Sequence, residues 1–401
     1  MTPRAVSFIH ASSEPNPWEP VRLHRCPPLM RTLRLLVLAP IWLATGCGAS
    51  SLSTVRTVRV EETRVRATTD GQGGLRVETL SPDVLFDDGN THLRAGRCSE
   101  AVERYDRLVA EFPSSRYVSA ALYNGGLCLA ERQDWEGSTL RYARLLELRP
   151  GSADEKHARL QMAEGLERLE RWELAEHNAD AVLRRDDLSS AERLEALARR
   201  ARAVLGRGRL DDAARLAREA VSYFRTRTGD EVIRDEYFAA MAAYVLAETI
   251  RLRSESLTLP AGTVLEQHDV LDRRAGLLLD AQRAYFDAIR LTDPHWAAAA
   301  GYRIGAMYRA FFDAITQAPV PPPPRPMTEN QLALYQESYR SQLRDRVRPL
   351  VRHAIRYWEL TLTMVERTGV QTEWTARVRH DLEATRGLLL DDSLATHAAS
   401  P

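Results

Sequence analysis

Apolar residues recur with a helical period along most of this chain. From Pro82 onward the sequence is rich in Ala, Leu, Arg and Glu, apolar residues lie three and four positions apart, and strand-like runs largely disappear. This pattern predicts a succession of amphipathic helices. Upstream of Pro82 the pattern differs, because a short apolar run ends just before Cys47 and a stretch rich in Ser, Thr, Val and Arg follows it.

Two helical segments align with each other at an offset of 37 residues. The first, LFDDGNTHLRAGRCSEAVERYDRLVAEFP, starts at Leu85, and the second, LYNGGLCLAERQDWEGSTLRYARLLELRP, starts at Leu122. A third copy has Ala163 at the position of the repeated glycine, and a fourth has Ala201 there. The equivalent residues of the first two copies are Gly89 and Gly126, Tyr105 and Tyr142, and Pro113 and Pro150. Such repetition predicts stacked structural units.

Each copy is expected to form two antiparallel helices. Small residues such as Gly89 and Gly126 let the first helix approach the second closely, and Tyr105 and Tyr142 of the first two copies fill the space between neighbouring units. A proline ends the second helix, since it supplies no backbone N–H and clashes with the preceding turn.

The pattern resembles the tetratricopeptide repeat, which has Gly or Ala about eight residues into the unit, Ala near twenty, an aromatic residue near twenty-four and Pro near thirty-two. The resemblance covers residues 82–227. It implies an all-α fold, a right-handed α-solenoid of antiparallel helix pairs. The residues EFPSSRY between the first two copies are similar to periplasmic members of the family, which include lipoproteins of outer-membrane protein assembly and the Tol-associated coordinator of envelope constriction.

Past residue 228 the copies degrade. Residues 228–317 still have helical spacing and are expected to form further helix pairs. The segment APVPPPPRP, within residues 318–327, interrupts them, because consecutive prolines force an extended polyproline II conformation. Residues 328–391 are expected to form C-terminal helices that cap the solenoid, and residues 392–401 a disordered tail.

The segment MRTLRLLVLAPIWLATGC, from Met30 to Cys47, has the order of a secretory signal: two arginines, an apolar run, then small residues. The run is shorter than the roughly 20 apolar residues that a membrane-spanning helix needs. Its end, ATGC, resembles the lipobox of bacterial lipoproteins, which implies a lipid-modified Cys47 as the first mature residue. We interpret residues 1–46 as an N-terminal extension and a lipoprotein signal, with Met30 as the hypothesised true start.

Residues 47–81 would then join the lipid anchor to the helical repeats. The alternation in TVRTVRVEETRVR and the turn residues DGQGG are compatible with a β-hairpin, but their composition favours a flexible, solvated tether. Gly48 follows the anchor, and in lipoprotein families a residue other than Asp at this place implies transfer to the outer membrane. The expected localisation is therefore the outer membrane, facing the periplasm.

Composition argues against several classes of function. The 401 residues contain 55 Lys and Arg and 55 Asp and Glu, so no net field draws the molecule to nucleic acid. No glycine-rich phosphate loop follows a strand, the ten histidines are scattered, and no Cys-x-x-Cys pair is present. We expect no metal site, no cofactor and no catalytic residue.

Cys98 and Cys128 fall on two helices that should pack antiparallel. An oxidising periplasm permits a disulfide between them. Two unbonded, small apolar residues are the alternative, and this alternative is slightly favoured.

Carrying the family's partner-binding positions onto this register gives eleven residues on the first helices of the four copies. They combine apolar and charged side chains, as suits an extended or helical peptide. The predicted groove residues are Phe86, Asn90, Arg94, Tyr123, Leu127, Glu131, Leu160, Glu164, Arg168, Ala198 and Arg202.

These patterns together predict a lipoprotein scaffold that binds a protein or peptide partner in an envelope complex. Tol–Pal or TonB-like energy coupling, outer-membrane assembly, motility and secretion are the candidate processes. The alternative is a helper of glycan export that binds polysaccharide or peptidoglycan, which exposed aromatic residues on the concave face would favour. An enzyme with a site between the repeats and the C-terminal helices is a third, weaker alternative.

Overall fold

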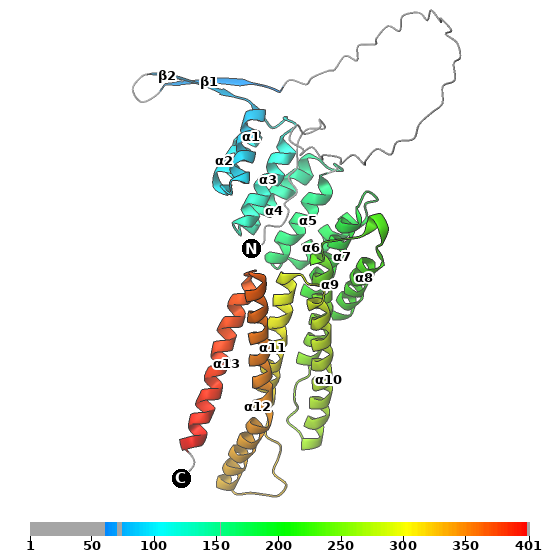
Figure 1. The fold of residues 1–401 in the computed structure, drawn as a ribbon, viewed down its shortest axis with the longest axis vertical. Helices are drawn as coiled ribbons and strands as arrows, with labels where there is room; N and C mark the ends of the chain where they lie inside the picture. Colours follow the sequence, from blue (N-terminus) through cyan, green and yellow to red (C-terminus); the bar gives the residue numbers. More distant parts are fainter. Residues whose placement is uncertain (1–60, 70–73, 153, 399–401) are drawn as a thin grey trace, which may run out of the picture.

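The computed structural model describes residues 61–69, 74–152 and 154–398, and Cys47 and the signal lie outside them. It confirms an all-α solenoid built from antiparallel helix pairs (Figure 1). The pairs are α1 (Pro82–Arg94) with α2 (Cys98–Glu111), α3 (Val118–Glu131) with α4 (Trp135–Leu148), α5 (Glu155–Arg168) with α6 (Trp172–Leu183), α7 (Ser190–Gly206) with α8 (Leu210–Thr226), α9 (Tyr237–Glu255) with α10 (Val264–Ile289), and α11 (Pro294–Thr316) with α12 (Glu329–Thr368). A last helix, α13 (Glu373–Ala398), packs on α11 and α12.

Local sequence determines where several of these helices begin. Ser189 and Thr263 each accept a hydrogen bond from the backbone N–H three residues ahead, and the glutamate there bonds back to the N-cap. This reciprocal capping box satisfies donors that the first turn leaves free. Thr328 forms the same arrangement with Gln331 and starts α12 directly after the proline-rich segment.

Close contact between a small residue and an aromatic ring holds the first two pairs together. A Cβ atom on Gly89 would lie 2.5 Å from Cε1 of Tyr105, and one on Gly126 would lie 2.7 Å from Cε1 of Tyr142. Both tyrosines are fully buried. The repeated glycines are therefore required by the space that the rings occupy, as the sequence pattern predicts.

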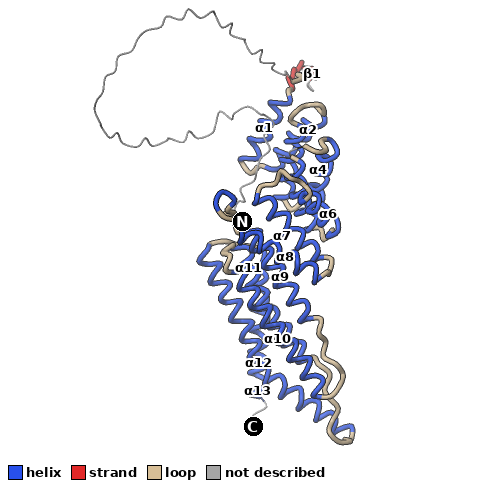
Figure 2. The backbone as a smooth tube through the Cα atoms, turned by 90° about the vertical axis from the view of Figure 1, so that its right-hand side faces the viewer, coloured by secondary structure: helices blue, strands red, loops and turns tan. Residues whose placement is uncertain are grey.

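The second half of the chain has longer helices and a larger core. This core spans residues of α7 to α13, and Trp296 and Trp358 are its largest fully buried side chains. The Trp358 Nε1–H donates to the carbonyl of Tyr302 at 3.0 Å. A Cβ on Gly305 would lie 2.3 Å from that nitrogen, so α11 and α12 repeat the small-residue contact with a larger ring. Figure 2 shows these long helices running together to the end opposite the N-terminal pairs.

The proline-rich segment joins α11 to α12 and is fixed to the neighbouring helices. Gln267 on α10 is buried and donates to the carbonyls of Pro260 and Pro319 at 3.1 and 2.8 Å. The Tyr335 hydroxyl on α12 donates to the carbonyl of Pro321 at 3.3 Å.

Helix α13 presents the polar outer side that the end of a solenoid requires. Its Trp374, Val378 and Leu382 are buried, whereas Arg379 and Glu383 are exposed. The helix continues to Ala398, through most of the segment expected to be a disordered tail. Alanine and leucine in this segment favour helix. Within the described part of the chain, no helix has the length and apolar character to cross a membrane.

The expected flexible tether needs a correction, because a β-hairpin occupies its second half. Strands β1 (Arg64–Thr69) and β2 (Leu75–Leu80) pair antiparallel. The carboxylate of Glu111 at the end of α2 bonds Arg66 at 2.7 Å and Arg64 at 3.4 Å. Leu80 is buried in the hydrophobic core formed by the N-terminal helices α1 to α5. These contacts with α2 stabilise the hairpin, and local composition does not reveal them.

The glycine–tyrosine contact generates a stability prediction. In Gly126→Ala the new methyl group meets the Tyr142 ring, so we expect the free energy of unfolding to fall by about 1–3 kcal/mol. Gly276→Ala is the matched control, since Gly276 is exposed within α10 and has no atom within 4 Å of its Cβ position. This control should gain up to about 1 kcal/mol from helix propensity. Urea unfolding followed by circular dichroism measures both, and equal stabilities would contradict the packing argument.

Candidate partner-binding face

The first helices of the six pairs and α13 lie next to one another along one side of the solenoid. We call this side the inner face. It consists of α1, α3, α5, α7, α9, α11 and α13, and the second helix of each pair lies behind it. All eleven predicted groove residues lie on the first four of these helices.

Five of the predicted groove residues are buried and cannot contact a partner. The Phe86 ring stacks on Tyr117 with their centroids 5.0 Å apart, and Tyr123 packs on Tyr142. Asn90 accepts hydrogen bonds from the Tyr105 hydroxyl at 2.7 Å and from the Asn124 side chain at 3.1 Å. The buried five are Phe86, Asn90, Tyr123, Leu160 and Ala198.

Packing between successive helix pairs explains this correction. Tyr117 immediately precedes α3, so the start of the second pair covers Phe86 on α1. Burial also raises the pKa of the Tyr123 hydroxyl above its ordinary value. Phe86 and Asn90, which the repeat register assigns to the groove, therefore belong to the contact between the first two pairs.

The other six predicted residues reach the surface of the inner face. Three of them are exposed, and three are partly exposed. We call this set the open stripe: Arg94 on α1, Leu127 and Glu131 on α3, Glu164 and Arg168 on α5, and Arg202 on α7.

An ion-pair network lies beneath the part of the open stripe that α5 and α7 form. Buried Arg199 on α7 donates to Glu164 at 2.7 Å and to Glu195 at 2.8 Å. Arg202 lies 3.0 Å from a carboxylate oxygen of Glu167, which is also buried. Charged residues of neighbouring first helices are thus held at fixed positions.

Electrostatics keeps Arg199 charged in spite of its burial. Desolvation alone would lower the pKa of the guanidinium, but Glu164, Glu195 and Glu167 outweigh it and raise this pKa well above its usual value. For Glu167 the balance is reversed, because burial raises the carboxyl pKa more than Arg199 and Arg202 lower it.

Aromatic rings complete the network on the side of α9 and α11. The guanidinium of Arg199 lies 5.3 Å from the Phe238 ring centroid, and that of Arg202 lies 5.2 Å from the Trp296 ring centroid. Both distances are within the range of cation–π attraction. Sequence reasoning missed Arg199 and Glu167, although each lies directly next to a predicted groove residue, Ala198 and Arg168.

The start of α13 contacts three other helices of the inner face. Arg168 at the end of α5 pairs with Glu373 at 3.2 Å, although 205 residues separate them in sequence. Trp374 packs against Tyr302 on α11 and Tyr244 on α9, with centroids 5.5 and 6.3 Å apart. The start of α13 therefore packs on the α9–α11 part of the inner face and reaches the end of α5.

A second charged cluster fixes α9 to the helices around it. The buried Glu248 carboxylate bonds Arg251 at 2.7 Å, lies 3.2 Å from Arg303 on α11, and accepts a hydrogen bond from the hydroxyl of Tyr285 on α10. Burial raises the pKa of Glu248, but the two arginines and the tyrosine outweigh it, so this pKa lies below its usual value. The cluster joins three helices by charge.

Cys98 and Cys128 are both buried, and the structure describes them without a bond between them. The Cys98 thiol donates to a carboxylate oxygen of Glu131 at 3.2 Å. Desolvation, followed by hydrogen bonds with Cys128 and Glu131, raises the pKa of the Cys98 thiol. Burial also raises that of Cys128.

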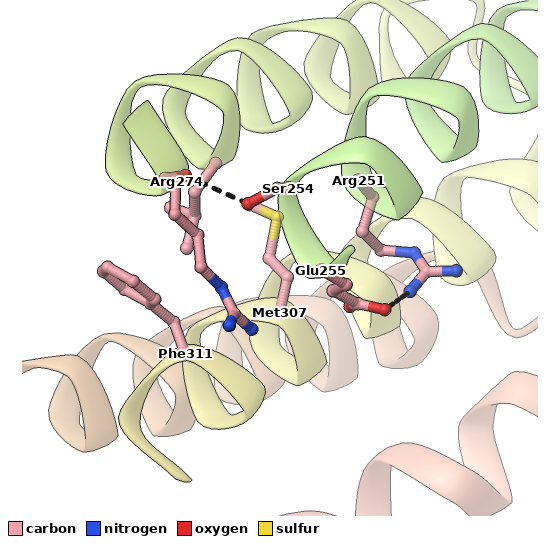
Figure 3. Close-up of a pocket in the computed structure, with 7 residues that line it drawn as sticks. Arg251, Ser254, Glu255, Arg274, Met307 and Phe311 are labelled. Atoms are coloured by element: carbon pink, nitrogen blue, oxygen red, sulfur yellow. Dashed lines mark hydrogen bonds and ion pairs between the residues drawn. The ribbon is translucent and has the colours of Figure 1, made fainter. Parts of the chain in front are cut away.

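The structure has a small, partly open cavity between α9, α10 and α11 (Figure 3). Its volume of about 10 Å³ has room for one water molecule at most. Ser254 donates to the carbonyl of Arg274 at 3.0 Å beside it, and Arg251 pairs with Glu255. No group of three or more His, Cys, Asp or Glu side chains in the described ranges is placed to hold a metal ion.

No family model and no curated protein match this chain. Solved structures of helical-repeat proteins do resemble it. MamA from Desulfovibrio magneticus RS-1 is 15% identical and has a TM-score of 0.35, over 51% of this chain and 96% of MamA. A tetratricopeptide repeat protein from Parabacteroides merdae is 14% identical, with a TM-score of 0.37 over 76% of this chain and 98% of that protein.

The helix pairs themselves, with their small-residue and tyrosine contacts, define the fold. The chain is a tetratricopeptide-like α-solenoid. The TM-scores are too low for the solved structures to indicate a function.

The Arg199 network generates a second prediction. In Arg199→Ala the buried Glu167 and the partly buried Glu164 lose a cation, so we expect a loss of about 3–5 kcal/mol in the free energy of unfolding. Arg215→Ala is the control, because Arg215 is exposed and its pair with Asp212 contributes less than about 1 kcal/mol. Should Arg199→Ala prevent folding, the melting temperature of Arg199→Lys replaces it. Stabilities equal to the control would refute the role of the network.

Thiol chemistry gives a third prediction. Because the thiolate is the nucleophile and both thiols have raised pKa values in buried sites, Cys98 and Cys128 should resist alkylation by iodoacetamide in the folded protein at pH 8. After unfolding in guanidinium without reductant, both should react within minutes. Mass spectrometry counts the added groups, and failure to react after unfolding would instead indicate a disulfide.

Proposed function

We propose that this protein is a lipid-anchored scaffold of the bacterial cell envelope that holds a protein or peptide partner on the open stripe. The observation that supports the proposal is the arrangement of Arg94, Glu131 and Arg168 near the ends of three successive first helices. Their charges alternate in sign along the solenoid. A partner whose charges alternate in the opposite order would match these three side chains in only one alignment along the solenoid.

The stripe also contains an apolar contact. Leu127 precedes Glu131 by one helical turn on α3 and is partly exposed. Glu164 and Arg168 have the same four-residue spacing on α5, so each pair lies on one face of its helix. An extended or helical segment lying across α1, α3 and α5 would meet charged and apolar groups in turn.

Rigidity favours binding on this surface. Arg199 and Glu167, which are buried beneath the stripe, fix the positions of its members Glu164 and Arg202. Side chains that are already ordered lose less entropy when a partner binds, which strengthens affinity.

The location is part of the proposal. The signal-like segment before Cys47 supports export and lipid modification, and Gly48 supports transfer to the outer membrane. An acyl anchor there would place the solenoid in the periplasm, where energy-coupling, assembly, motility or secretion complexes supply partners. Glycan binding is less favoured, because Trp296, Trp374 and Tyr123 on the inner face are buried and offer no platform for sugar rings.

A charge exchange on the stripe tests the proposed function. In the full chain, Arg94→Glu combined with Glu131→Arg preserves net charge and reverses two of the three alternating charges. The control is Arg218→Glu combined with Glu219→Arg, which exchanges two exposed charges on α8, the second helix of its pair. Envelope partners are identified by crosslinking in cells and mass spectrometry.

We expect the stripe variant to lose a crosslinked envelope partner by at least about tenfold, equivalent to roughly 1.4 kcal/mol of binding free energy. The control variant should retain it, and far-UV circular dichroism should show both to be folded. Equal recovery of all partners with both variants would overturn the stripe as the binding surface.

A further inference from the structure

The β-hairpin has one face bound to the helices and one bare apolar face. In the antiparallel register, Val65, Ala67, Leu75 and Val77 lie on the same side of the two strands. Val65 is 69% exposed, Leu75 72% and Val77 56%. We call this side the outer hairpin face.

The opposite side of the hairpin is occupied by α2. Arg64 and Arg66 alternate with Val65 along β1, and both bond Glu111. On β2, Glu78 pairs with Arg107 of α2 at 2.6 Å. Because side chains of a strand alternate between its two faces, the outer hairpin face points away from α2.

Such a face is costly to leave in water. A two-stranded sheet is marginally stable by itself, and an exposed row of large apolar residues normally marks a contact surface. None of the described segments covers this row, as the exposed fractions show. Something outside the described part of the chain is therefore expected to cover it.

The place of the hairpin in the molecule indicates what that is. Figure 1 shows β1 and β2 lying across the end of the solenoid formed by α1 and α2, whereas the ends of α12 and α13 mark the opposite end. Figure 2 shows β1 at the same extremity. The outer hairpin face is thus presented at the end where the chain enters the fold.

We propose that the outer hairpin face contacts the surface of the lipid bilayer that holds the anchor. This inference depends on the proposed lipid modification of Cys47. Only 16 residues lie between Cys47 and Arg64, which is a span of at most about 60 Å when fully extended.

A tether of this length keeps the hairpin at a high effective concentration near the bilayer, so a weak contact suffices. Three large apolar side chains inserted at the headgroup boundary supply that contact. The solenoid is thereby oriented with its N-terminal pairs next to the membrane and α12 and α13 directed away from it.

The test places an environment-sensitive NBD fluorophore on the outer hairpin face. The lipidated full chain carrying Val77→Cys is labelled and incorporated into vesicles of phosphatidylethanolamine and phosphatidylglycerol. The matched control carries Leu140→Cys on α4, a position that is 72% exposed and remote from the hairpin. Native Cys98 and Cys128 are buried and are masked from labelling in the folded protein.

We expect the Val77 label to show a blue-shifted emission and to be quenched by lipids with a spin label near the headgroup. The Leu140 label should show neither change. Water-like emission at both positions, in protein that floats with the vesicles, would overturn the bilayer contact while leaving the lipid anchor intact.

Two other outcomes are distinguishable. Protein that fails to float refutes the anchor in the proposed function and removes the basis of the bilayer contact. A blue shift at Val77 that weakens on dilution of the protein and resists lipid quenching would assign the face to a second copy of this chain, which overturns the bilayer contact.

Discussion

Contact between a small residue on one helix and an aromatic ring on the next is the interaction on which this solenoid depends. Tyr105 and Tyr142 occupy the space above Gly89 and Gly126, and Trp358 occupies that above Gly305. Each contact brings two helix axes close enough for both to bury their apolar sides. A larger side chain at these glycines could not fit beside the ring, so the helices of these pairs could not approach as closely.

The repeated pairs could be predicted from sequence because this contact is local. Gly89 and Tyr105 belong to the same helix pair, so their spacing repeats whenever the geometry repeats. The burial of Phe86 could not be predicted in this way, because the residue that covers Phe86 is Tyr117 of the next pair. The hairpin was underestimated for the same reason, since the carboxylate that fixes it, Glu111, lies more than 40 residues away.

The chain has no net charge, but it contains clusters of buried charged side chains. Arg199 and Glu248 are buried, and each is surrounded by groups of opposite charge from neighbouring helices. Buried ion pairs often contribute little more to stability than well-packed apolar residues, but removing one partner is costly. These clusters therefore fix the relative positions of α5, α7, α9 and α11, and so determine which charged side chains remain free on the inner face.

The contact between α5 and α13 shows how a partner could gain access to the lower end of the open stripe. Arg168 and Glu373 are both partly exposed, with side chains 34% and 43% accessible, so their ion pair contributes at most about 1 kcal/mol. Trp374 is buried against Tyr244 and Tyr302, and the buried Val378 and Leu382 attach the helix further along its length. In the proposed function, a partner carboxylate would therefore replace Glu373 at Arg168 at little cost while α13 stays in place. Binding at the stripe then requires no rearrangement of the C-terminal helices.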